Sequence, residues 1–300
     1  MDKIVLLAGG SGFIGSRLQV LLKEKGYTVR VLTRTPRGAG QFAWDPARGT
    51  MDEAALEGVS AIVNLAGAGI ADGRWTPARK KLLLDSRVES ARLLRDALRR
   101  SGARPSVYVS ASAIGYYGNS GEQLMRETDP PRTGGFLSDT CRVWESAADE
   151  VAALGIRTVK FRVGVVLDKT GGALKEIARP LYFGLGSYFA DGKAWYSWIH
   201  RDDMCRALIY AIENESLAGV YNAVAPHPER IKPLVKAAAR AMRRPVLFAP
   251  VPAFALRILF GEMADTILFS NLVSAEKLQA AGFRFEFPEL DGAMKAIFQS

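Results

Sequence analysis

Short apolar runs alternate with segments of helical hydrophobic spacing through the first three quarters of the chain. Four of these runs, bounded by glycine or polar residues, predict buried strands at 4–8, 28–33, 61–66 and 107–111. Helical patterns separate the strands. Because consecutive parallel strands need such crossovers, the pattern predicts a parallel sheet with helices on both faces.

Two long helices belong to this part of the chain. Thr76 and Pro77 form a typical helix start, and leucines and valines recur at helical spacing until Ser101, before Gly102. The second helix is predicted at 139–154. A strand at 157–167, a helix at 202–213 and a strand at 220–223 complete the alternation.

The pattern changes in the remaining segments. Glycines interrupt 170–195, and prolines break 226–300 into short helical stretches. We therefore predict two α/β parts. A doubly wound parallel sheet domain would comprise 1–166 and 195–225, and a smaller, mostly α-helical C-terminal substrate or cap domain would comprise 167–194 and 226–300.

Composition favours an ordinary globular protein, with 48% hydrophobic and 24% charged residues among 300. Cys141 and Cys205 are too few for a disulfide framework and have no metal-ligand spacing to the two histidines, so we expect a reducing cytoplasm and no metal. Glycines interrupt the apolar start before it could act as a signal-peptide core, and 246–260 is too short and too broken by proline to span a bilayer. A membrane protein is not expected.

The formal net charge is +9, with many of the lysines and arginines between Arg79 and Arg104. Such a cluster suggests nucleic-acid binding. Several of these arginines, however, recur on one face of the predicted helix, opposite its leucines. A solvated helix face explains the cluster better, so we expect no nucleic-acid partner, whereas attraction of an anionic cofactor agrees with the charge.

The most informative motif joins the first strand to the first helix. Gly10, Gly12 and Gly15 satisfy G-x-G-x-x-G at this position. Glycines here let backbone N–H groups approach a pyrophosphate at a helix N-terminus, where the helix dipole favours negative charge. The residues predicted to bind a dinucleotide are Gly9, Gly10, Ser11, Gly12, Phe13, Ile14 and Gly15.

Two further strand ends extend this predicted site. Thr33 and Arg34 end the second strand, where an NAD-binding unit would carry an acidic residue for the ribose. An arginine can pair with a 2′-phosphate, so NADP is favoured over NAD, with Arg37 as a weaker second candidate. The alternative is a surface arginine. Small residues follow the third strand and would leave room for the cofactor, in the run Asn64, Leu65, Ala66, Gly67 and Ala68.

At this point the chain resembles the extended, epimerase/dehydratase-like short-chain dehydrogenase/reductase superfamily, whose cofactor domain is a Rossmann-type fold. The matching motifs are the glycine turn, 64–67, 109–112, 161–164 and 199–203. A subgroup of uncharacterised sugar-nucleotide epimerase-like proteins with its own C-terminal domain is similar over nearly the whole chain. Its marks are 73–76, 86–88, 197–200, 222–226 and 260–263.

The resemblance implies a serine that hydrogen-bonds the substrate carbonyl, a tyrosine that exchanges the proton, and a lysine that lowers the tyrosine pKa. Ser112 matches the serine. If Glu145 is the family's helix glutamate, Leu137 and Cys141 occupy the tyrosine and lysine positions. None of the nine tyrosines is followed four positions later by lysine, so the usual dyad is missing.

Two tyrosines near Ser112 are candidate substitutes. Tyr116 and Tyr117 lie in a short loop after the strand, where either one donates a proton or both form an aromatic wall. Arg142 either supplies the missing charge or faces solvent. The resemblance implies an NADP(H)-dependent oxidoreductase or nucleotide-sugar-epimerase-like enzyme, monomeric or homodimeric, for a small carbonyl, alcohol or sugar-nucleotide substrate. The alternative is a non-catalytic NADP(H) sensor or partner-binding protein.

Overall fold

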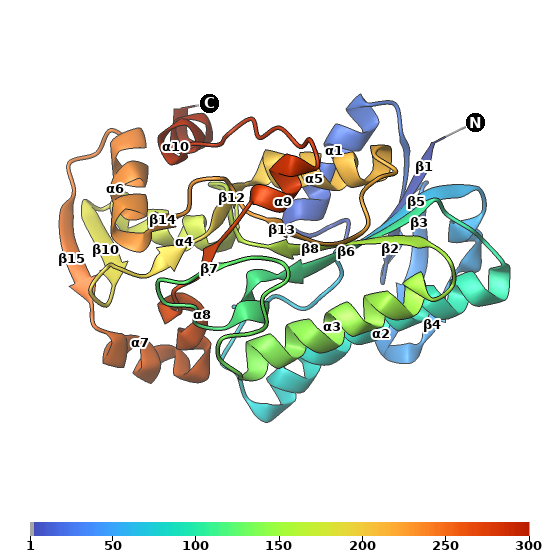
Figure 1. Cartoon of the computed structure of the whole chain (residues 1–300), viewed down its shortest axis with the longest axis horizontal. Coiled ribbons are helices and arrows are strands. Elements are labelled where there is room, and N and C mark those ends of the chain that lie inside the picture. Colours follow the sequence, from blue (N-terminus) through green and yellow to red (C-terminus); the bar gives the residue numbers. More distant parts are fainter. Residues whose placement is uncertain (1–2, 300) are drawn as a thin grey trace.

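An eight-stranded sheet forms the centre of the protein (Figure 1). The computed structural model describes residues 3–299. In spatial order the strands are β13 (Gly219–Ala223), β8 (Arg157–Val163), β6 (Val107–Ala113), β5 (Val59–Asn64), β1 (Ile4–Ala8), β2 (Thr28–Thr33), β3 (Gln41–Asp45) and β4 (Thr50–Met51). Neighbouring strands are parallel, except that β4 is antiparallel to β3. The chain builds outward from β1 in both directions, which makes the end of β1 a topological switch point.

Helices cover both faces of this sheet. One face carries α1 (Phe13–Glu24) and α5 (Arg201–Glu213), and the other carries α2 (Pro77–Ser101) and α3 (Phe136–Ala152) (Figure 1). Side chains of β1 alternate between the two layers, because successive strand residues point to opposite faces. Val5 and Leu7 pack in the core with α1 and α5, whereas Leu6 and Ala8 pack in the core with α2 and α3. The near-continuous apolar character of β1 follows from this double burial.

A second core lies beyond the end of β8. There β9 (Val165–Leu167) pairs in parallel with β12 (Trp198–His200), and β10 (Leu185–Phe189) pairs in parallel with β15 (Leu247–Val251). The helices α4 (Gly172–Leu181), α6 (Ile231–Ala241) and α10 (Leu290–Gln299) pack against them around Trp198. The remaining elements are β7 (Leu124–Met125), β11 (Trp195–Tyr196), β14 (Glu229–Arg230), β16 (Leu272–Val273), α7 (Ala253–Phe260), α8 (Asp265–Leu268), α9 (Glu276–Ala280) and four 3₁₀ turns, η1 (Pro46–Arg48), η2 (Glu53–Leu56), η3 (Ile114–Tyr117) and η4 (Gly261–Ala264).

The predicted α/β class with a doubly wound sheet is confirmed. Strands β1 and β2 and helix α2 have the predicted bounds, whereas β3 and the pair formed by β10 and β15 were not predicted. The division into two domains stays a prediction. Leu278 and Phe283, which lie in the predicted cap, pack in the core under the main sheet. Within residues 3–299, no helix is both long and apolar enough to cross a membrane.

Gly164 explains why the single strand predicted at 157–167 is divided into β8 and β9. A Cβ atom at this position would lie 2.4 Å from the Ser197 carbonyl oxygen and 2.7 Å from Cγ1 of Val224. Only glycine allows this approach, so the chain can leave the main sheet here and pair with β12 instead.

We expect Gly164→Ala to lower the free energy of unfolding by about 1–3 kcal/mol, because the new methyl group would overpack a backbone contact. Chemical denaturation measures the change. Gly38→Ala is the matched control, since a Cβ atom there meets nothing within 4 Å and the backbone needs no positive φ. Equal stability of the two variants would contradict the assigned role of Gly164.

Candidate cofactor and substrate site

Three loops meet at one edge of the sheet. Strands β2 and β5 flank β1 and run parallel to it, so their carboxyl ends share an edge. The glycine turn follows β1, Thr33 and Arg34 lie at the end of β2, and the segment from Asn64 to Ala68 follows β5. The structure therefore brings together all three predicted cofactor-binding segments.

The glycine turn packs directly against backbone. Gly9 has φ of +78°, and a Cβ atom there would lie 2.7 Å from the carbonyl carbon and oxygen of Leu65. A Cβ atom on Gly15 would lie 2.3 Å from the Gly9 carbonyl oxygen. Side chains at either position would push the turn away from the β5 loop and from the first turn of α1. The glycines therefore preserve the close approach that a pyrophosphate site needs.

Among residues 3–299, no acidic side chain caps the N-terminus of α1. Gly12 is its N-cap and offers no side-chain hydrogen bond, and the first turn contains no acidic residue. The first N–H groups of a helix lack intrahelical acceptors and favour an anion. This exposed, glycine-lined cradle fits the pyrophosphate of a nicotinamide dinucleotide, with Ser11 exposed beside it.

Arg34 and Arg37 are both exposed next to this cradle. Neither forms an ion pair with any residue in the described range 3–299. The loop that holds them is ordered by hydrogen bonds from the Thr35 amide to Thr33 Oγ1 (3.4 Å) and from the Arg37 amide to Gln41 Oε1 (2.8 Å). Two guanidinium groups are thus available at the end of β2.

Asn64 has a positioning role. Its Nδ2 donates to Ser90 Oγ (3.2 Å) and to the Tyr108 hydroxyl (2.9 Å), and its Oδ1 accepts from the Ala66 amide (3.1 Å). These hydrogen bonds within the protein occupy both the oxygen and the nitrogen of the buried Asn64 amide group. The Ala68 amide donates to Ser86 Oγ at 2.9 Å. Asn64 therefore holds the small-residue loop against the sheet, and the loop backbone is what faces the cofactor edge.

A cavity of about 510 Å³ extends from the start of α1 toward the C-terminal elements. Its walls are mainly apolar, and its polar side chains come from β6, α2, α3, β11 and the residue after it, α8 and the loop before β16. The lining residues are Phe13, Ile14, Leu65, Ile70, Arg87, Ala111, Ser112, Ala113, Ile114, Gly115, Leu137, Thr140, Cys141, Trp144, Val163, Gly164, Val165, Trp195, Tyr196, Ser197, Thr266, Phe269 and Asn271. Phe13 and Ile14 belong to both the glycine turn and the cavity, so the two sites are continuous.

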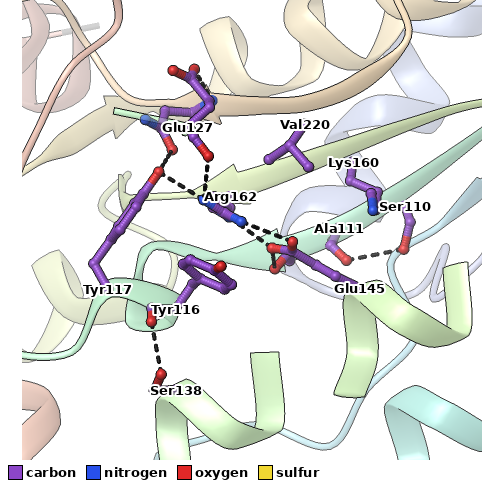
Figure 2. A network of polar contacts seen from close by, with 12 residues as sticks. Ser110, Ala111, Tyr116, Tyr117, Glu127, Ser138, Glu145, Lys160, Arg162 and Val220 are labelled. Carbon is purple, nitrogen blue, oxygen red and sulfur yellow. Dashed lines mark hydrogen bonds and ion pairs between the residues drawn. The ribbon is translucent and has the colours of Figure 1, made fainter. Parts of the chain in front are cut away.

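Ser112 reaches a buried ion pair behind the cavity wall. Its Oγ donates to Glu145 Oε1 at 2.8 Å, and Arg162 donates to both carboxylate oxygens, from Nε at 2.8 Å and from Nη2 at 3.0 Å. Figure 2 shows the forked contact between Glu145 and Arg162. A serine hydroxyl has one hydrogen, which here points to Glu145. Toward a ligand Ser112 therefore offers lone pairs.

Tyr116 and Tyr117 both contact Arg162 and lie outside the set of residues that line the cavity (Figure 2). The Arg162 guanidinium carbon stands 3.4 Å from the centre of the Tyr116 ring. The Tyr117 hydroxyl accepts from Arg162 Nη1 (3.0 Å) and donates to Asn222 Oδ1 (2.7 Å), and burial raises its pKa to about 12. Proton transfer from Tyr117 to a substrate would first have to break its bond to Asn222.

Leu137 and Cys141, which the resemblance places at the tyrosine and lysine positions, both line the cavity. Burial, together with the nearby Glu145 carboxylate, raises the pKa of the Cys141 thiol to about 12. Cys141 is thus a neutral thiol. Arg142 does not supply the missing charge, because its side chain is 63% exposed and pairs with Asp139 on the outer side of α3.

Among the polar lining residues that the sequence analysis did not single out are Arg87 and Trp144, and it also missed the pairing of Glu145 with Arg162. A signal for Arg87 was present. Leu83, Arg87 and Ala91 are four residues apart, which places the arginine on the buried stripe of α2. Arg162 is a charged residue within a buried strand, which itself requires a partner.

Comparisons with known proteins agree with this arrangement. Residues 5–138 match the NAD dependent epimerase/dehydratase family, and residues 251–297 match a domain of unknown function (DUF1731). The epimerase family protein Mb2239 of Mycobacterium bovis is 37% identical over 296 residues, which cover 98% of this chain and 97% of that protein. This chain belongs to the NAD dependent epimerase/dehydratase family.

Two solved structures extend the comparison. Human epimerase family protein SDR39U1 with NADPH has a TM-score of 0.89 and 32% identity, covering 99% of each chain. The Thermus thermophilus UDP-glucose 4-epimerase complex with NAD has a TM-score of 0.78 and 22% identity, covering 99% of this chain and 98% of that one, and shows a shared fold. Family membership and the anion cradle together support a nicotinamide cofactor for this chain.

We expect Glu145→Ala to lower the free energy of unfolding by about 3–5 kcal/mol, because it leaves Arg162 buried without a carboxylate. Glu145→Leu combined with Arg162→Met should cost less than Glu145→Ala, since no unpaired charge remains. Urea denaturation compares them. Glu53→Ala, which breaks an exposed pair with Arg100, is the control and should cost about 0–1 kcal/mol. A double variant less stable than Glu145→Ala would contradict this account.

Proposed function

We propose that this chain is an NADP(H)-dependent oxidoreductase or nucleotide-sugar-epimerase-like enzyme that acts by hydride transfer at a carbonyl or alcohol carbon. One observation carries the proposal. The anion cradle of α1 continues without a break into an apolar cavity through Phe13 and Ile14, and Ser112 lies in the wall of that cavity. Such an arrangement suits a dinucleotide whose phosphates lie at the helix and whose reactive ring enters a dry pocket.

The preference for NADP rests on Arg34 and Arg37. Both are exposed, and no acid in the described part of the chain pairs with either of them. A 2′-phosphate would provide the acceptor oxygens for one or both guanidinium groups. The solved structure of the similar human protein SDR39U1 is one with NADPH, which supports the same preference.

Ser112 and Glu145 provide a proton route that does not need the missing dyad. When bound, the nicotinamide supplies or accepts the hydride. Because Ser112 Oγ donates to Glu145, it can accept a hydrogen bond from a substrate hydroxyl. As the carbon loses its hydride, the hydroxyl proton moves to Ser112 Oγ, whose own proton moves to Glu145 Oε1. Reduction uses the same route in reverse.

Arg162, Tyr116 and Tyr117 act as positioning residues in this proposal. Arg162 orients the Glu145 carboxylate through two hydrogen bonds, and the two tyrosines hold Arg162 from its other sides. Their aromatic and hydroxyl contacts keep Glu145 aligned with Ser112. The tyrosines thus serve the site without touching the substrate.

A non-catalytic sensor is the second candidate. The observation in its favour is that Leu137 and the neutral Cys141 stand at the cavity wall where the family's proton-transfer residues are expected. A sensor would retain the cradle and Arg34 for binding and would transfer no hydride.

We expect Arg34→Glu to weaken NADPH binding about ten- to hundredfold and to leave NADH binding nearly unchanged, because it removes a charge-assisted bond to the 2′-phosphate. Isothermal calorimetry with both cofactors measures this. Arg104→Glu, an equal charge change at another exposed arginine, should retain wild-type affinity. Equal affinity of the wild-type protein for NADPH and NADH would reject the preference.

Turnover separates the enzyme from the sensor. We expect deuterium from 4-deuterated NADPH to appear in the product from at least one member of a panel of aldehydes, ketones and keto acids, as detected by mass spectrometry. Ser112→Ala should lower this rate about 10²-fold or more through loss of the proton route, with NADPH affinity unchanged. Ser216→Ala, at an exposed turn, is the control. Tight NADPH binding without deuterium transfer would favour the sensor.

A further inference from the structure

The cavity contains one positive charge that no protein carboxylate neutralises. Arg87 is the one charged side chain among the described residues that line it. Within residues 3–299 it forms no ion pair, and because Cys141 is a neutral thiol, the charged group that acts on Arg87 is another arginine, Arg79. Burial is the main cause that lowers the pKa of Arg87, yet an arginine side chain remains protonated in proteins. An unpaired cation of this kind is costly unless a ligand compensates it.

Helix α2 holds Arg87 in place. Its Nη1 donates to the Leu83 carbonyl oxygen at 2.7 Å, and its guanidinium carbon lies 5.0 Å from the centre of the Trp144 ring on α3. The side chain also passes close to Gly67, where an added Cβ atom would lie 3.2 Å from Arg87 Cζ. A guanidinium has five N–H donors, and the structure described here provides one acceptor, the Leu83 carbonyl. The remaining donors are available to a ligand.

Trp144 lies beside this cation. Its side chain is 7% exposed, and its Nε1 is buried without a hydrogen-bond partner in the described part of the chain. Trp144 lines the same cavity and lies in contact with Arg87. Because protein atoms cover Nε1, Trp144 contributes its aromatic ring as the wall beside the Arg87 guanidinium.

The remainder of the lining sets the character of the ligand. Around Arg87 and Trp144 the walls are mostly aliphatic and aromatic, with Ile70, Leu137 and Phe269 among them. A sugar nucleotide carries two phosphate charges, for which this lining offers one cation. A phosphate monoester carries close to two charges at neutral pH. A single carboxylate matches one guanidinium in charge and in planar geometry.

We infer that the substrate is an apolar carbonyl or alcohol compound with one carboxylate, which Arg87 binds inside the cavity. This inference rests on the proposed function, because the carbonyl or alcohol carbon must lie near Ser112 and the nicotinamide. Arg87 acts here in substrate binding. The glycine cradle and Arg34 bind the cofactor phosphates without it.

The test compares acids with their own esters. NADPH affinity is measured first by calorimetry for the wild type and for Arg87→Met. Binding of phenylglyoxylate, 4-oxo-4-phenylbutanoate, their methyl esters and UDP-glucose is then measured in the presence of saturating NADP⁺. We expect at least one acid to bind about tenfold or more tightly than its ester in the wild type. In Arg87→Met this ratio should fall to about one, and Arg87→Lys should restore part of it.

Two controls keep the result specific. Arg99→Met removes an exposed arginine from the same helix and should preserve the ratio of acid to ester affinity. Arg87→Met should melt at or above the wild-type temperature, because it replaces an unpaired, partly buried cation with an apolar chain of similar length. A loss of binding would then not be due to unfolding.

Several results would overturn the inference. A carboxylate site at Arg87 would be excluded if the esters bound as tightly as the acids, or if the preference for acids persisted in Arg87→Met. It would also be excluded if no acid bound at concentrations up to about 10 mM. Tight UDP-glucose binding that depends on Arg87 would assign the residue to a sugar nucleotide. Loss of NADPH binding in Arg87→Met would assign it to the cofactor. Failure of the wild type to bind NADPH is a different outcome, which rejects the proposed function itself.

Discussion

The contact between the glycine turn and the loop after β5 is the constraint on which the site depends. Gly9 lies so close to the Leu65 backbone, and Gly15 so close to Gly9, that no side chain fits at either position. This contact joins the ends of β1 and β5 at the topological switch point of the sheet. It sets the direction of α1 and leaves the N-terminal amides of the helix open. The start of the cavity at Phe13 and Ile14 follows from the same geometry.

The buried Arg162 and the half-buried Arg87, both near the cavity, differ in how the fold compensates their charge. Arg162 has a forked carboxylate partner, a stacked tyrosine ring and a hydroxyl acceptor, so its charge is compensated within the protein. Arg87 has one carbonyl acceptor and an aromatic ring. The Arg162 charge is tolerated because Glu145 is present, whereas the Arg87 charge has no carboxylate that offsets its partial burial. The first is thus suited to holding a side chain in position, and the second to binding a ligand.

The cavity also depends on segments that are distant in the sequence. Gly164 lets the chain leave the main sheet, so that β9 and β12 form a second small sheet beside it. Ser197, in the turn before β12, donates to the Asn271 carbonyl oxygen at 2.8 Å and accepts from the Val273 amide at 2.9 Å. These bonds fasten the C-terminal segment over the cavity, where Asn271 and Phe269 complete its wall.

The sequence by itself determined the sheet, its helices and the location of the cofactor loops. Apolar runs such as Ile4–Ala8 and the capped, amphipathic segment Pro77–Ser101 carry local signals, since burial on both faces and helical periodicity are visible in consecutive residues. The glycine motif, and the fact that no tyrosine is followed four positions later by lysine, are likewise matters of spacing. The edge strand Gln41–Asp45 was missed because only its tertiary pairing with β2 makes it a strand.

Only the tertiary structure decided which polar groups meet. Ser112, Glu145 and Arg162 come from three elements, and in their network the Ser112 hydroxyl donates to Glu145, which leaves its lone pairs for other partners. Tyr116 and Tyr117, which follow Ser112 closely in the sequence, contact Arg162 and do not line the cavity. Arg87 lies on a helix face that the sequence can indicate, but its lack of a carboxylate depends on the whole packed environment. Local sequence patterns determine the helices and strands. Whether a buried charge finds a partner of opposite charge depends on which side chains the assembled fold brings together.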